Sequence, residues 1–244
     1  MPSVHEVSGP LARFCRPVPA RGPGVCAICH GCTRPGFSTC YSCAHVTGQV
    51  RRPCHQVVPM SLYAIPSGLH TTLRSYKDGG AADGRRRHTA FVASLLARFL
   101  FDHGDCLRRG RVGGWDFITT VPSTGRPGPH PLEGALSMVP WLAAQHRETL
   151  VRGSGAMGHN VACDTGFVAL PDVGGARVLV VDDTFTTGAR AQSAASALAL
   201  AGARVVAVVP IGRVIDPGHG EHALAYWTSR SREAFDFGRC CLEE

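Results

Sequence analysis

The chain has 244 residues, of which 44% are hydrophobic and 18% are charged, a composition typical of a soluble globular protein with a buried core. The formal net charge is +7, and almost all of it is arginine. Excess arginine suits phosphorylated ligands or nucleic acid, although a bias in genome composition explains it equally well. No apolar run approaches the ~20 residues of a transmembrane helix, and the first residues lack the apolar core of a signal peptide. We therefore expect a cytoplasmic protein without a membrane span.

Two cysteine pairs near the start of the chain have the spacing of a zinc ribbon. Cys26 and Cys29 form one C-x-x-C knuckle, and Cys40 and Cys43 form a second one after ten intervening residues. Four such thiolates are expected to hold one structural zinc ion, in place of a core too small to fold alone. The nearby residues His30, Cys32 and His45 leave a substituted ligand open, and four unpaired reduced thiols are the alternative.

The remaining cysteines show no second pair of knuckles. Cys15 and Cys54 stand alone, and four others are scattered and are interpreted as small core or surface residues: Cys106, Cys163, Cys240 and Cys241. Residues 46–60 are basic and contain prolines, as a linker does. We therefore expect a ribbon and linker over residues 1–57, a larger domain over 58–230 and a tail over 231–244.

The larger domain begins with alternating strand and helix signals. A short strand from Ser61 leads into a helical turn, and the apolar stripe from about Arg87 to His103 predicts a helix. Residues 115–121 predict a strand, and residues 131–147 predict a helix interrupted by Pro140. The glycine-rich residues 152–160 are either a flap that closes over a reacting centre or an inert surface loop. Phe167 then begins a predicted edge strand.

The most informative stretch runs from Val178 to Arg190. Four apolar residues predict a parallel strand buried on both faces, and Asp182 and Asp183 stand at its carboxyl end. A hydroxyl-rich turn follows, and then an alanine-rich helix over 189–200. Residues 203–209 predict another parallel strand.

The turn has the chemistry of a phosphate site. Free backbone N–H groups at a helix N-terminus bind a phosphate dianion, and Gly188 allows its close approach. The two carboxylates are suited to accept hydrogen bonds from a ribose diol, so the predicted ligand is a ribose 5-phosphate. The residues expected at its phosphate are Thr184, Phe185, Thr186, Thr187 and Gly188.

Other folds share parts of this stretch. A receiver domain also has two acids after an apolar strand, but it needs a later lysine, and Lys77 is the only lysine and lies far upstream. The P-loop and dinucleotide glycine motifs are both missing from the sequence. An ordinary strand-turn-helix connection with polar residues is the remaining alternative.

The stretch Val-Leu-Val-Val-Asp-Asp-Thr-Phe-Thr-Thr-Gly resembles the phosphoribosyl pyrophosphate motif of type I phosphoribosyltransferases. The resemblance implies a parallel sheet flanked by helices, with Asp182 and Asp183 as catalytic residues that hold the ribose hydroxyls. It also implies Mg²⁺ bound with the donor, and a pyrophosphate held by the loop after the strand at residues 115–121. The pyrophosphate residues would be Ser123, Thr124 and Arg126.

The order of the parts resembles the ComF family of competence-associated proteins, in which a cysteine-knuckle ribbon precedes a phosphoribosyltransferase-like domain. Supporting pieces are Pro66-Ser-Gly-Leu, Tyr76-Lys77, Val121-Pro122 and Asn160-Val161. The resemblance implies transfer of the phosphoribosyl group to an unknown acceptor, for which we expect a nitrogen nucleophile. The alternative is an accessory protein for DNA uptake or processing that binds the donor or a nucleotide without turnover, with the basic ribbon contacting nucleic acid or a DNA-processing protein.

Overall fold

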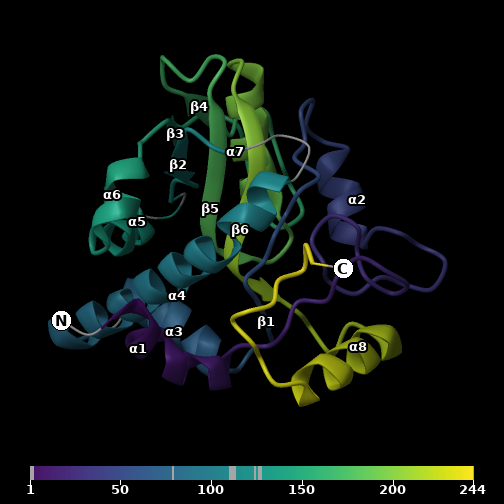
Figure 1. Ribbon diagram of the computed structural model, residues 1–244. Helices are drawn as coiled ribbons and strands as arrows, with labels where there is room; N and C mark the ends of the chain where they lie inside the picture. Colours follow the sequence, from purple (N-terminus) through teal and green to yellow (C-terminus); the bar gives the residue numbers. More distant parts are fainter. Residues whose placement is uncertain (1–2, 79, 110–113, 124, 126–127, 244) are drawn as a thin grey trace.

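A four-stranded parallel sheet forms the centre of the protein (Figure 1). The computed structural model describes residues 3–78, 80–109, 114–123, 125 and 128–243. The strand order is β1-β6-β5-β2, and these strands span Ser61–Tyr63, Arg204–Val214, Arg177–Phe185 and Phe117–Thr120. The predicted α/β class, with a parallel sheet flanked by helices, is confirmed.

Strand β5 is longer than the sequence pattern predicts. The apolar run ends at Val181, but the strand continues to Phe185 because Thr184 and Phe185 pair with Gly212 and Arg213 of β6. The two acids therefore lie within the strand, and the turn itself is confined to residues 186–188.

Alternate residues of β5 enter different parts of the core, as the two-residue period of a strand requires. Leu179 and Val181 belong to one cluster of buried apolar residues, whereas Val178 and Val180 belong to another. All four side chains are fully buried, so both faces of this strand are covered. This explains why the sequence shows a continuous apolar run there instead of an alternating pattern.

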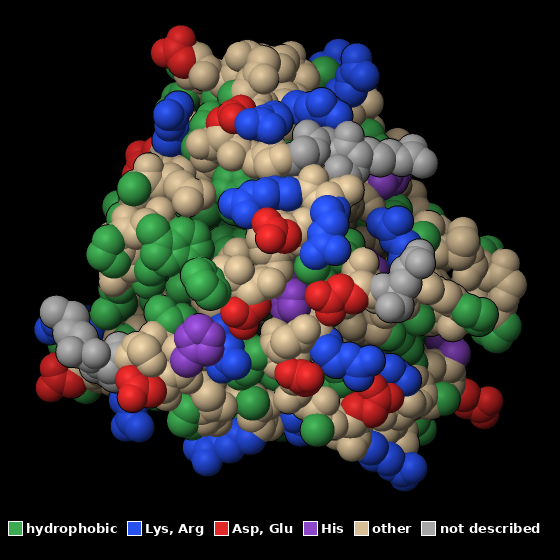
Figure 2. Space-filling model, in the orientation of Figure 1, with side chains coloured by type: hydrophobic (Ala, Val, Ile, Leu, Met, Phe, Trp, Pro, Cys, Tyr) green, Lys and Arg blue, Asp and Glu red, His purple; other side chains and the backbone are tan. Residues whose placement is uncertain are grey.

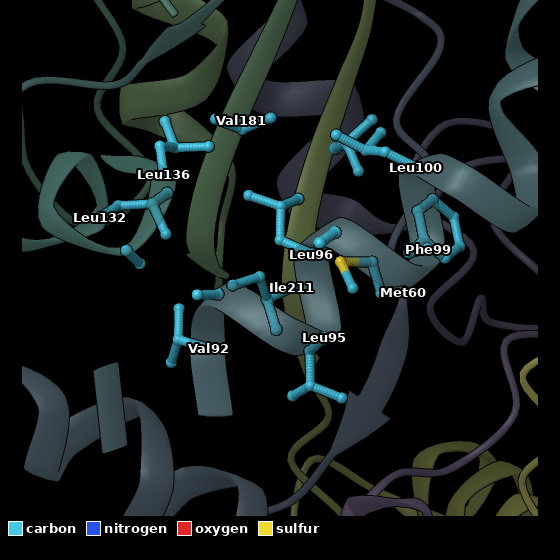
Figure 3. Packing of buried hydrophobic residues seen from close by; sticks show 14 of the residues in the cluster. Met60, Val92, Leu95, Leu96, Phe99, Leu100, Leu132, Leu136, Val181 and Ile211 are labelled. Carbon is cyan, nitrogen blue, oxygen red and sulfur yellow. The ribbon is translucent and has the colours of Figure 1, made fainter. Parts of the chain in front are cut away.

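The helix α4, Ala82–Arg109, covers the first face and crosses in front of the sheet in Figure 1. Figure 3 shows its side chains Leu95 and Leu96 beside Ile211 of β6. The helix is longer at both ends than the predicted 87–103, and Asp83 in its first turn suits the positive end of the helix dipole. Two further helices pack on this side: α3, Gly68–Asp78, and α5, Pro131–Ser137.

The helix α7 and the cysteine segment cover the opposite face. The helix spans Ala189–Leu200, as predicted, and its buried alanines pack with Val178 and Val180. The cluster on this face also contains Cys26, Cys29 and Cys43, so the cysteine segment packs directly against the sheet. The division into domains at residues 57 and 58 stays a prediction.

The other elements lie around this centre. Strands β3, Leu150–Arg152, and β4, Phe167–Ala169, form a separate antiparallel pair, so the predicted edge strand does not join the main sheet. Pro140 divides the predicted helix at 131–147 into α5 and α6. The remaining helices are α1 Val4–Ser8, a 3-10 helix Gly9–Phe14, α2 Tyr41–Thr47, α6 Pro140–Gln145 and α8 Glu221–Arg232.

The surface shows mixed charges on the side that carries α4. Figure 2 shows arginine and lysine side chains interspersed with aspartate and glutamate side chains over this face. Such a mixture differs from the continuous basic stripe of a typical nucleic-acid-binding surface. Within the described part of the chain, no helix is long and apolar enough to span a membrane.

Candidate functional site at the carboxyl edge of the sheet

A pocket of about 660 Å³ lies at the carboxyl edge of the parallel sheet, where ligands bind in open α/β folds. All four strands of the sheet contribute to it, either by their last residues or by the loops that follow them. Asp182 and Asp183 line it together with the whole predicted phosphate loop, Thr184 to Gly188, and with Ser123. The structure thus brings these predicted residues together, whereas Thr124 and Arg126 lie outside the described residues.

The two acids differ in their surroundings. Asp183 is only 3% exposed, and its Oδ2 accepts a hydrogen bond from the hydroxyl of Tyr76 and forms an ion pair with Lys77 Nζ. Asp182 is partly exposed, and its Oδ1 accepts a hydrogen bond of 2.8 Å from the Asp183 N–H. Asp183 is therefore held in place by protein partners, and Asp182 is the acid more open to a ligand.

The environment of Asp182 alters its titration. Burial of the carboxyl group, followed by repulsion from Asp183, raises its pKa to about 7, and the charge of Lys77 opposes the shift. Near neutral pH, the carboxylate of Asp182 is therefore ionised in only part of the protein molecules. A bound cation would favour the ionised form, because it stabilises the negative charge.

The loop after β5 is shaped by Gly188, which caps α7 with a φ of 84°. A Cβ atom at this position would lie 2.2 Å from Cζ of Phe185, whose ring is buried under the loop. Only glycine fits here, for both its backbone conformation and the close approach. The phenyl ring of Phe185 is packed away from solvent, so this residue offers a phosphate only its backbone.

The loop hydroxyls have different tasks. Thr187 Oγ1 accepts hydrogen bonds from the N–H groups of Asn160, at 3.3 Å, and Ala189, at 3.4 Å. The hydroxyl of Tyr63 donates to Thr184 Oγ1 at 3.3 Å, and Thr186 is exposed. Thr186 is therefore the loop hydroxyl most open to a ligand, together with the free N–H groups of the first turn of α7.

A candidate cation position lies beside the acid pair. One potential ligand atom from each of His130, Asp182 and Asp183 falls within 4.8 Å of the others. Mg²⁺ prefers oxygen ligands and keeps several waters, so a carboxylate beside an anionic ligand suits it. Because Asp183 already contacts Tyr76 and Lys77, Asp182 is the carboxylate better able to bind the ion.

The glycine-rich segment after β3 also reaches the pocket. Gly158 and His159 are among its lining residues, and the neighbouring Asn160 contacts Thr187 as described above. Residues 158–160 of the segment therefore lie against the phosphate loop. Whether it opens and closes stays a prediction.

Sequence reasoning missed the contacts of Tyr76 and Lys77 with Asp183. Both residues come from the last turns of α3, more than 100 positions before Asp183. A signal was present, because Lys77 is the only lysine in the chain and is followed by Asp78 and glycines. Tyr76-Lys77 is also one of the pieces that support the family resemblance, but the resemblance assigned no role to these two residues.

The four cysteines of the predicted ribbon form one compact cluster. Their Sγ atoms all lie within 4.8 Å of one another, and those of Cys29 and Cys40 are 3.8 Å apart. Zinc bound tetrahedrally at about 2.3 Å holds its sulfurs about 3.8 Å apart, so the spacing fits this ion. Among the described residues, this group does not include the open alternatives His30, Cys32 and His45.

The environment favours thiolate at Cys29. Hydrogen bonds from the other three cysteines, that of Cys26 being strongest, and the charge of Arg213 hold the pKa of Cys29 well below its usual range. Arg213 is 8% exposed, and its Nε donates to Cys29 Sγ at 3.2 Å. A charged donor beside a metal thiolate is typical of an outer shell that orients the ligand.

Comparison with known proteins adds no identification to this geometry: no protein-family model matches the chain, and a search of curated proteins gives no significant match. The site is therefore described by its own residues and contacts.

Proposed function

We propose that the protein is a phosphoribosyltransferase-like enzyme of the ComF type, which binds phosphoribosyl pyrophosphate with Mg²⁺ at the carboxyl edge of the sheet. The observation that carries the proposal is the junction of an acid pair with a phosphate-type loop. Asp182 and Asp183 line the same pocket as Thr184 to Gly188 and the first turn of α7. A ribose carrying a 5-phosphate would present its hydroxyls to the acids and its dianion to the loop.

The 5-phosphate would bind at the start of α7. Free N–H groups and the positive end of the helix dipole favour a dianion there, and Thr186 adds an exposed hydroxyl donor. Gly188 keeps the loop free of a side chain at the point of closest approach. Three cationic side chains also line the pocket and complement an anionic ligand: Arg74, Lys77 and Arg190.

The ribose hydroxyls would face Asp182, while Tyr76 and Lys77 hold the carboxylate of Asp183 in place. The residues fit a magnesium ion, which would be held by Asp182 and the oxygens of the donor. Such an ion neutralises charge on a leaving pyrophosphate. Ser123 and, by prediction, Thr124 and Arg126 would hold the pyrophosphate from the loop after β2.

In the proposed reaction, the bond between the ribose anomeric carbon and the pyrophosphate oxygen breaks, and the pyrophosphate leaves with the electron pair. The acceptor nitrogen would form the new bond to the anomeric carbon and then lose its proton to solvent. Positive charge develops on the sugar while the pyrophosphate leaves. The protein then acts mainly by positioning and by electrostatic stabilisation. In this proposal the carboxylate of Asp182 would orient the ribose and face the developing charge.

The four-cysteine cluster would hold a structural zinc ion in this proposal. It packs on the sheet behind the phosphate loop, and Arg213 joins the two through hydrogen bonds to Cys29 Sγ and to the Thr186 carbonyl. Its role would be to fix the back of the loop, and no part of the reaction is assigned to it.

The test is the release of pyrophosphate from phosphoribosyl pyrophosphate and Mg²⁺ by the zinc-loaded protein, screened against nucleobases and small amines as acceptors. We expect acceptor-dependent release that Asp182→Asn abolishes. The matched control is Asp116→Asn, a surface carboxylate paired with Arg177, which should leave release unchanged. Donor binding without release from any acceptor would instead favour the accessory-protein alternative.

A further inference from the structure

A second group of metal-type ligands lies far from the four-cysteine cluster in sequence. His103 and Cys106 come from α4, and Cys240 and Glu243 come from the C-terminal segment. One ligand atom from each of the four lies within 4.8 Å of all the others. We propose that these residues form a second zinc site, which fastens the C-terminal segment to α4.

The histidine is oriented as a metal ligand. His103 is 2% exposed, and its Nε2 lies 2.8 Å from the carbonyl oxygen of Phe237. Because a carbonyl only accepts, this contact places the ring proton on Nε2 and leaves a lone pair on Nδ1. Nδ1 faces the cluster, at 3.9 Å from Cys106 Sγ and 3.6 Å from Glu243 Oε1. Histidines that bind metals commonly have this arrangement, with the second ring nitrogen donating to a carbonyl.

The carboxylate is oriented in the same way. Oε2 of Glu243 accepts a hydrogen bond of 3.2 Å from the Cys240 N–H, which fixes the group against its own turn. Its other oxygen, Oε1, lies 3.3 Å from Cys106 Sγ and points into the cluster. One oxygen is thus held by the backbone while the other is presented to the site.

The spacing is that of two knuckles. His103 and Cys106 are three residues apart on α4 and therefore share one face of that helix. Cys240 and Glu243 are also three residues apart, and the Glu243 N–H donates to the Cys240 carbonyl at 3.2 Å, which closes the turn. Each segment offers two ligands to one point, from positions more than 130 residues apart in the chain.

The donor set selects the metal. Two thiolates, one imidazole and one carboxylate are ligands that zinc accepts in tetrahedral sites, whereas Mg²⁺ and Ca²⁺ prefer oxygen alone. This set differs from the four thiolates of the ribbon, so the two sites should differ in affinity and in their response to acid.

The proposed site lies where the C-terminal segment packs against α4. After α8 the described residues 233–243 contain turns but no helix or strand. Figure 1 shows this segment, in yellow, turning back from α8 toward α4. It packs against α4, where Cys241 is buried in the same core cluster as Leu100 and Leu107. A metal ion would fasten a segment that has no regular backbone pairing.

The first test is the zinc content of the full chain after equilibration with buffered zinc under reducing conditions. We expect one more equivalent of zinc in the unaltered protein than in the variant carrying Cys106→Ser and Cys240→Ser. The control is Cys163→Ser, a partly exposed cysteine outside both clusters, which should keep the full content. Equal zinc content in the double variant and the unaltered protein would overturn the proposal, whatever the total.

The second test measures how well bound zinc protects the C-terminal segment from protease. Trypsin cleaves after Arg239, directly before Cys240. Bound zinc should slow this cleavage at least tenfold in the unaltered protein, and it should not slow cleavage of the double variant. Glu243→Gln, which keeps the size of the side chain, should weaken the protection. Cleavage at the same rate with and without zinc would contradict the fastening role, and a Cys106–Cys240 disulfide in the reduced preparation would exclude the metal site.

Discussion

Arg213 connects Cys29 with the loop that lines the pocket. Its Nε donates to Cys29 Sγ at 3.2 Å, while its Nη1 donates to the carbonyl oxygens of Phe185, at 3.2 Å, and Thr186, at 2.7 Å. The guanidinium group is buried, and the thiolates around Cys29 keep its pKa above the ordinary value. A single side chain therefore supports the proposed zinc cluster and the back of the phosphate loop.

Replacement of Arg213 by Met should reduce stability strongly. It leaves the buried Cys29 thiolate and the carbonyl oxygens of Phe185 and Thr186 without their donor, and the loss of one partner from a buried charged network costs about 3–5 kcal/mol. Urea unfolding of the zinc-loaded protein measures the difference. Arg177→Met is the control, because the exposed Arg177–Asp116 pair should contribute about 1 kcal/mol or less. Equal losses in the two variants would contradict a linking role for Arg213.

The affinity for the donor with Mg²⁺ should depend on pH through Asp182. Its pKa is raised to about 7 in the folded protein, so protonation removes the ionised form that, in the proposed function, would bind Mg²⁺ and the ribose hydroxyls. Stability from this group runs the opposite way, being greatest at low pH and lost as pH rises toward 7. The Kd for the donor should therefore fall about tenfold for each unit by which the pH rises toward 7, and it should stay constant above pH 7.

The control for this pH profile is Asp182→Asn. In this variant, only the pH dependence caused by the donor's own phosphates should remain. Lys77→Met offers an independent check. The positive charge of Lys77 lowers the pKa of Asp182, so its removal should move the midpoint of the profile to higher pH. A profile unchanged in all three proteins would exclude Asp182 as the titrating group.

Replacement of Tyr76 by Phe should destabilise the protein and weaken donor binding together. The hydroxyl donates to a carboxylate that is 3% exposed, and hydrogen bonds to charged groups contribute about 1.5–3 kcal/mol. Thermal and urea unfolding measure this loss. Tyr41→Phe changes a residue that is 69% exposed and should stay within about 0.5 kcal/mol of the unaltered protein.

A pair of glycine variants separates backbone strain from loop geometry. Gly188→Ala and Gly175→Ala both place alanine at a positive φ, of 84° and 75°, which costs about 1–2 kcal/mol. Only at position 188 does the new Cβ meet another side chain, the Phe185 ring at 2.2 Å, whereas position 175 is open. We expect Gly188→Ala to lose donor binding, whereas Gly175→Ala should keep it and lose only the stability that the backbone strain costs. Retained binding by Gly188→Ala would place the phosphate elsewhere.

The sequence predicts the elements whose signals are local. The apolar run at Val178 gave a strand buried on both faces, the alanine-rich stretch gave α7 with its bounds, and the cysteine spacing predicted the four-residue cluster. Each of these signals lies within about 20 consecutive residues, where periodicity and ligand spacing are informative.

Contacts between distant segments were not predictable in the same way. The partners of Asp183 come from α3, and the link at Arg213 comes from a stretch to which no chemistry was assigned. Cys106 and Cys240 are far apart in the sequence and were interpreted as small core or surface residues, but the fold brings their thiols together with His103. The end of β5 was also set too early, since its last pairs depend on the register of β6 and not on hydrophobicity.

The most direct measurement of the central claim is calorimetric titration of phosphoribosyl pyrophosphate with Mg²⁺ into the zinc-loaded protein, with Asp182→Asn and Asp116→Asn beside it. The account predicts binding in the micromolar range, about −8 kcal/mol, that Asp182→Asn loses and Asp116→Asn keeps. The double variant Asp182→Asn with Asp183→Asn should also fail to bind. No binding by the unaltered protein, or equal binding by all the variants, would contradict a donor site at the carboxyl edge of the sheet.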